Sequence, residues 1–187
     1  MELEQVTQAR GQTEATRAHA PTSTSALLEL LEAIEAREVI EQCLPRLAAD
    51  RRTEGDLHLL ARAVDGMRAA HDDARAFASC DLDFHLALAA AAKNDVLAAR
   101  LANLHDHVEE MIALFTETAF RERRVDALVD AHQRLTDAVR RQDLDEAPQI
   151  LTGMMALLRA EAWAVAPEDI HPSKAGPPAV PSKGAGA

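Results

Sequence analysis

Apolar residues recur every three or four positions along most of this chain, and no segment alternates regularly between apolar and polar residues. Alanine and leucine supply most of the apolar bulk, aromatic residues make up only 3%, and tyrosine is absent. Both alanine and leucine favour helices. The pattern therefore predicts an all-α fold, a bundle of six to seven helices without a strand.

The predicted helices lie between two segments of different composition, and 187 residues suffice for one domain. Residues 1–24 lack sustained apolar periodicity and are expected to form a flexible N-terminal arm. Residues 166–187 are rich in Pro, Gly, Ala and Ser, so a disordered tail is expected there. The helical domain is predicted over residues 25–165. Its helices are expected to start at Ser25 (with a bend near Pro45), after Thr53, and over residues 74–91, 96–118, 125–141 and 144–164.

Charge and motif content exclude several function classes. The net charge is −11, with 31 acidic against 20 basic residues. A DNA-binding face needs clustered Lys and Arg to neutralise phosphates, so no direct DNA binding by this chain is expected. Neither a signal peptide nor an apolar run of membrane-spanning length is present, which predicts a cytoplasmic protein without a membrane partner. Phosphate-binding glycine loops and Gly-x-Ser-x-Gly motifs are also absent.

One group of residues concentrates metal-binding chemistry. Asp81 and His85 stand four positions apart in a predicted helix, so both side chains lie on one face of it. A histidine on another helix, His132, can close such a site from the opposite wall. An Asp with two His suits a divalent ion of the Zn, Ni or Mn class. The alternative is a polar seam in which the histidines are hydrogen-bonded between helices.

Several fragments, taken in order, resemble the effector-binding FCD domain of FadR-type transcriptional regulators in the GntR family. The resemblance covers about residues 27–160. Any one fragment is weak, but the ordered set is fairly specific. The fragments are Arg37-Glu-Val-Ile-Glu41, Leu47-Ala-Ala-Asp-Arg51-Arg-Thr53 followed by Asp56-Leu57, Asp81-Leu-Asp-Phe84-His85, Asn94-Asp-Val-Leu97, Ala131-His132-Gln-Arg-Leu135, and Asp143 with Ala147.

The resemblance implies a helical bundle around a central small-molecule cavity with a metal at its floor. It also implies that Asp81, His85 and His132 are three of the family's metal ligands. The family's fourth ligand is a histidine, and the matching position here is Met154, a weak ligand for such ions. One alternative is that His105 or His107 turns inward and replaces it.

Arg37 has two interpretations. Its guanidinium can hold an effector carboxylate at the cavity wall, or it can pair with Glu41 at i,i+4. A further departure from the family is that the expected arm is too short for a winged helix-turn-helix. We therefore expect a stand-alone effector domain, a truncated chain, or a domain recruited to another task.

The leading functional hypothesis is a domain that senses a small molecule, an organic acid carrying a carboxylate, for a transcriptional regulator. The alternative is a metal-dependent enzyme that uses an open coordination position of the same site. A third interpretation is a structural or dimerisation module. Sequence alone does not decide whether the protein is an enzyme, although it favours sensing. It also leaves the oligomeric state open, with a homodimer among the options.

Overall fold

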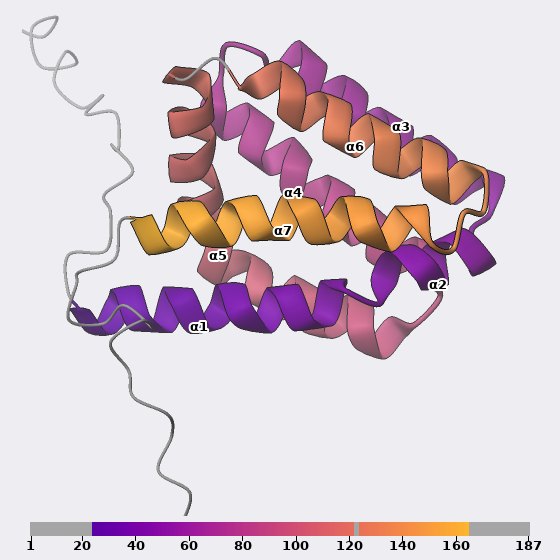
Figure 1. Ribbon diagram of the computed structural model, residues 1–187, viewed down its shortest axis with the longest axis horizontal. Helices are drawn as coiled ribbons and strands as arrows, with labels where there is room; N and C mark the ends of the chain where they lie inside the picture. The colour runs from indigo at the N-terminus through magenta and orange to yellow at the C-terminus, as the bar shows by residue number, and fades with distance from the viewer. Residues whose placement is uncertain (1–23, 122–123, 165–187) are drawn as a thin grey trace, which may run out of the picture.

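The computed structural model describes residues 24–121 and 124–164, and within these ranges the chain forms helices and no strand (Figure 1). The all-α prediction is confirmed. The arm predicted over residues 1–24 and the tail predicted over 166–187 lie outside the described residues, except for Thr24. The helices are α1 (Thr24–Glu41), α2 (Leu44–Arg51), α3 (Glu54–Ala69), α4 (Ala74–Ala91), α5 (Asp95–Arg121), α6 (Val125–Arg140) and α7 (Glu146–Ala164).

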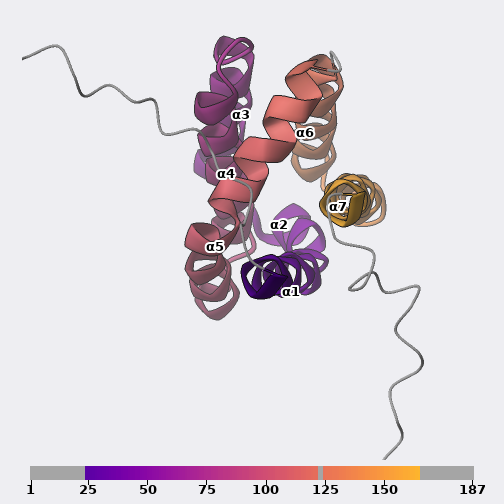
Figure 2. The same cartoon turned by 90° about the vertical axis from the view of Figure 1, so that its left-hand side faces the viewer.

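The helices form a bundle in which α4 packs against α2, α3 and α5. Helices α1 and α7 run side by side in opposite directions; both are seen end-on in Figure 2, where α5 crosses the view obliquely. Helix α6 packs against α3 and α7, so that α4, α5, α6 and α7 surround one part of the interior. None of the described helices has the length and apolar character needed to span a membrane.

Side-chain caps fix where two of the central helices begin. Thr53 precedes α3, and its hydroxyl accepts from the Asp56 amide while the Asp56 carboxylate accepts from the Thr53 amide. Lys93, which follows α4, contacts the same carboxylate at 2.7 Å and ties the two helices together. Asp73 caps α4 by accepting from two amides of its first turn.

The prediction for the first helix is wrong in one respect. The segment forms two separate helices and not one bent helix. Helix α1 ends at Glu41, and α2 begins at Leu44 with Pro45 in its first turn. Proline suits this position because the amides of a first turn have no intrahelical acceptor. The break places Glu41 at the end of α1, where it is fully buried.

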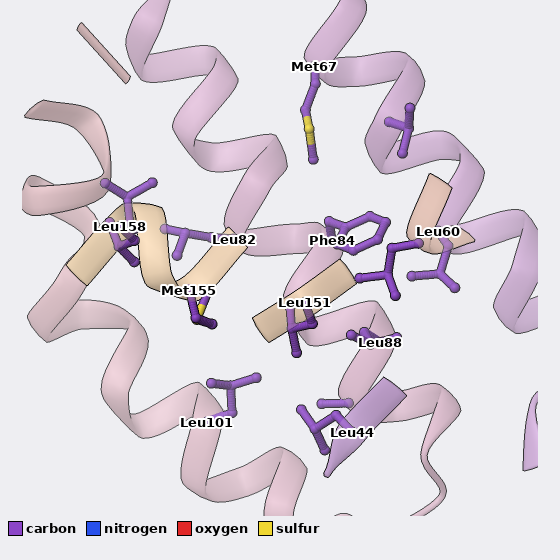
Figure 3. Close-up of a cluster of buried hydrophobic side chains, with 14 of the residues drawn as sticks. Leu44, Leu60, Met67, Leu82, Phe84, Leu88, Leu101, Leu151, Met155 and Leu158 are labelled. Carbon is purple, nitrogen blue, oxygen red and sulfur yellow. The ribbon is translucent and has the colours of Figure 1, made fainter. Parts of the chain in front are cut away.

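Leucines make up much of the core, together with the buried aromatic rings of Phe77 and Phe84. Phe84 of α4 is fully buried, with Leu60 of α3 and Leu151 of α7 close to it in Figure 3. Leu44 and Leu88 extend the same cluster. Since Phe84 lies between Asp81 and His85 in the sequence, packing of this ring also fixes the face of α4 that carries both polar groups.

Helices α3 and α4 approach closely at Gly66. A Cβ atom added there would lie 2.7 Å from the Cys80 sulfur, whereas one added at Gly153 of α7 would meet nothing within 4 Å. We expect Gly153→Ala to stabilise the protein by about 0.5–1 kcal/mol through helix propensity. Gly66→Ala should gain less or be destabilising, because the overlap costs about 1–3 kcal/mol.

Urea unfolding of Gly66→Ala, Cys80→Ala and the double variant measures the coupling between the two positions. Removing the sulfur should make Gly66→Ala more favourable by at least about 0.5 kcal/mol. Additive effects would show that the contact between the helices does not limit this position.

Candidate functional site

Helices α4 and α6 bring Asp81, His85 and His132 together. One ligand atom from each residue lies within 4.8 Å of the other two. The Nε2 atom of His132 is 3.0 Å from Asp81 Oδ1, and that of His85 is 3.9 Å from Asp81 Oδ2. Both imidazoles are buried, whereas Asp83 of the same helix is exposed. Asp81 and His85 share one face of α4, as their spacing predicted, and helix packing brings His132 of α6 to the same point.

The surroundings of the two imidazoles set which ring nitrogen faces the cluster. His132 Nδ1 lies 2.8 Å from the backbone oxygen of Leu128 and donates to it, which leaves Nε2 toward Asp81. His85 Nδ1 lies 2.6 Å from Glu41 Oε2, although the two atoms are not aligned for a hydrogen bond. The carboxylate charge favours a proton on that nitrogen, so His85 also presents Nε2 to Asp81.

When both imidazole rings are neutral, their Nε2 atoms are hydrogen-bond acceptors, as is the Asp81 carboxylate. The arrangement then directs three acceptors toward one point. His132 Nε2 has no hydrogen-bond partner among the described residues, despite its short distance from Asp81. Burial would raise the pKa of Asp81, but His132, His85 and Arg37 outweigh burial and hold it well below its usual range. An ionised carboxylate beside two imidazole nitrogens is bridged either by a proton on one of the rings or by a cation between the three groups. Their chemistry fits a borderline divalent metal ion.

A buried ion pair supports the cluster from α1. Arg37 Nε lies 2.5 Å from Glu41 Oε1, and both side chains are almost fully buried. Burial would raise the pKa of Glu41, but Arg37 and His85 lower it from 4.5 to about 2. Burial would likewise lower the pKa of Arg37, but Glu41 and Asp81 more than offset this and raise it.

Both interpretations of Arg37 are compatible with its position. The i,i+4 pair with Glu41 forms, and Arg37 also lines a pocket of about 180 Å³ together with Asp81, His85 and His132. Within the described part of the chain, its Nη1 atom has no hydrogen-bond partner. The guanidinium therefore keeps hydrogen-bonding capacity that no described residue uses.

Helices α5, α6 and α7 supply the rest of the pocket wall. Arg124, at the start of α6, lies 2.7 Å from Glu161 of α7 and 6.0 Å from the centre of the Phe115 ring of α5. Arg124 and Glu161 are both about one-third exposed, so this ion pair marks the more open side of the pocket. Apolar side chains from the three helices include Ile112, Phe115, Leu128, Ala131 and Leu158.

Met154 lines the same pocket from α7, as its alignment with the missing ligand requires. The side chains of His105 and His107 lie outside the part of the structure that is described. Sequence reasoning missed Glu41 as a partner of His85 and missed Arg124. A signal for Glu41 was present, because an acidic residue at the end of an apolar helix, four residues after an arginine, is a candidate for a buried pair.

Glu41→Gln tests the buried pair. The variant leaves the Arg37 charge without its closest partner, so at neutral pH the free energy of unfolding should fall by about 3–5 kcal/mol. Because the folded-state pKa of Glu41 is depressed from 4.5 to about 2, its contribution is present above pH 4.5 and disappears as pH falls toward 2. Urea unfolding of the chelator-treated protein at several pH values measures this difference.

Glu32→Gln, an exposed position on the same helix, is the matched control and should change stability little at any pH. A difference between wild type and Glu41→Gln that persists unchanged down to pH 2 would contradict the charge-based explanation.

Comparison with known proteins identifies the domain. Residues 29–157 match the FCD domain. The galactonate operon transcriptional repressor of Escherichia coli is 30% identical over 125 residues, covering 65% of this chain and 52% of that protein. The HTH-type transcriptional regulator LutR of Bacillus subtilis is 30% identical over 131 residues, covering 64% and 57%. The HTH-type transcriptional repressor NanR of Escherichia coli is 32% identical over 117 residues, covering 63% and 44%.

The chain thus spans about half the length of the curated relatives it matches. The solved structure of E. coli McbR/YncC has the same fold, with a TM-score of 0.61 at 18% identity over 71% of this chain and 67% of that one. Because the FCD match spans more than half of the sequence, this chain belongs to the FCD domain family and is homologous to the regulators of the GntR family.

Proposed function

We propose that this FCD domain senses a small organic acid, which binds above a divalent metal ion held by Asp81, His85 and His132. The observation that carries the proposal is the convergence of these three ligands at the buried end of a pocket. The homology to transcriptional regulators supports sensing in preference to catalysis.

The residues around the pocket have different roles in the proposed binding of metal and acid. Glu41 and Leu128 orient the two imidazoles through their Nδ1 atoms, so that Nε2 of each is available to a metal. A bound metal would supply a Lewis acid for the oxygens of a carboxylate. Arg37 adds a fixed positive charge and a buried N–H group on the same side of the pocket.

Binding at this point reaches several helices at once. The pocket is lined from α1, α4, α5, α6 and α7, so an occupant contacts all of these helices, and we propose that their relative packing changes when it binds. We infer that a DNA-binding unit responds to this change, an inference supported by the homology to transcriptional regulators. The signal is therefore a difference in helix packing between the empty and occupied pocket.

Metal titration tests the ligand set. Asp81→Asn should weaken Zn²⁺ or Ni²⁺ binding at least about tenfold, because it removes the only carboxylate ligand of the set. Asp83→Asn, two residues away and exposed, is the matched control and should bind like wild type. Calorimetry gives the affinities, and the shift of Tm with added metal gives an independent measure. Equal affinities for Asp81→Asn and wild type would refute the site.

Met154→His tests the alignment of α7. If Met154 stands where the fourth ligand would be, the added imidazole should raise affinity for Zn²⁺ or Ni²⁺ relative to wild type. Ala156→His, exposed on the same helix and outside the pocket lining, should not. Equal affinities for Met154→His and wild type would mean that α7 has another register or that another ligand fills the position. In a sensor the variant also changes effector affinity, whereas an enzyme would lose turnover.

A further inference from the structure

Among the described residues that line the pocket, polar side chains occupy two places. At the buried end are Arg37, Asp81, His85 and His132, of which the arginine and both histidines are at most 2% exposed. Of the described lining residues that are more exposed, Arg124 carries a charge and Leu157 is 52% exposed. This gradient in burial gives the pocket a polar floor and a more open mouth.

The wall between floor and mouth is apolar. It consists of alanine, leucine, isoleucine, methionine and phenylalanine side chains from α5, α6 and α7. Among the lining residues that the structure describes, none carries a hydroxyl or a carboxamide group. The backbone oxygen of Leu128, one possible acceptor, already accepts from His132. Among these described residues, a ligand body seated against the wall finds almost no hydrogen-bond partner.

This lining discriminates against hydroxylated ligands. A hydroxyl group leaves its hydrogen bonds with water when it enters such a pocket, and nothing on the wall replaces them. Each unpaired hydroxyl lowers affinity roughly tenfold or more. An acid with several hydroxyls is therefore a poor occupant, whereas an apolar body of the same skeleton gains from burial.

The volume of the pocket and the charges around it further restrict the class of ligand that fits. The pocket volume of about 180 Å³ is slightly larger than the roughly 150 Å³ cavity that admits benzene in another protein. One anionic group matches the floor, where Arg37 keeps an unpaired N–H group among the described residues. The Arg124 charge at the mouth is already opposed by Glu161 at 2.7 Å, so the mouth does not require a second anion.

We infer that the effector is a monocarboxylate with an apolar body of about six carbons, such as an alkyl, cycloalkyl or aryl carboxylate, and not a polyhydroxylated acid. The inference rests on the proposed function, since it places the carboxylate at the floor of the same site. The hydroxyl-free wall is the feature that makes the choice.

A matched pair of acids tests the inference. Cyclohexanecarboxylate and quinate share a ring and a carboxylate, but quinate adds four hydroxyl groups. Calorimetric titration of the Zn²⁺-loaded protein should show cyclohexanecarboxylate binding at least about 100-fold more tightly. Quinate binding equally or more tightly would overturn the inference and leave the sensing of a carboxylate intact. If neither acid binds, the inference and the proposed function both fail.

A pocket variant locates the bound acid. Ala131→Leu adds bulk to the wall and should lower the affinity for cyclohexanecarboxylate at least about tenfold. Ala99→Leu makes the same change at an exposed position of α5 that does not line the pocket. Metal content is measured in both variants before titration, so that loss of metal is not mistaken for loss of the acid. Wild-type affinity in Ala131→Leu would place the acid elsewhere and overturn the inference.

Discussion

The buried Glu41 carboxylate is the point on which the rest of the site depends. It pairs with Arg37 on its own helix and reaches His85 on α4, so one carboxylate joins two helices and two cationic or ionisable groups. A buried charge without such partners would be strongly unfavourable. The end of α1 must therefore stay beside α4, which in turn places Arg37 within 3.9 Å of Asp81.

Core packing gives this polar cluster its orientation. Phe84 and Leu88 are fully buried, and their turn of α4 cannot rotate without exposing them. The same turn carries His85, which is therefore held toward α6 and His132 (Figure 3 shows Phe84 and Leu88 in the core). Apolar burial thus determines where the ligands point, and the ion pairs determine which atoms they present.

Helical spacing predicted the part of this arrangement that lies within one helix, and the family resemblance added His132 from a second helix. The pairing of Asp81 with His85 could be predicted, because i,i+4 spacing is a property of the helix itself. The pairing of Glu41 with His85 was not, because it depends on how α1 packs against the rest of the bundle. The break between Gln42 and Leu44 was misplaced for a different reason: Pro45 was interpreted as a bend inside a helix, although it occupies a first turn.

The floor and the wall of the pocket have different roles in the proposed recognition of a ligand. Asp81, His85 and His132 form the proposed cation site, and Arg37 adds a guanidinium beside it, a combination suited to a carboxylate whatever its body. The wall comes from α5, α6 and α7, whose lining residues contribute shape and almost no hydrogen bonds. Substitution on these three helices can change which acid fits without disturbing the ligand set. In the proposed function the floor therefore sets the charged group that binds, and the wall sets which body of that acid fits.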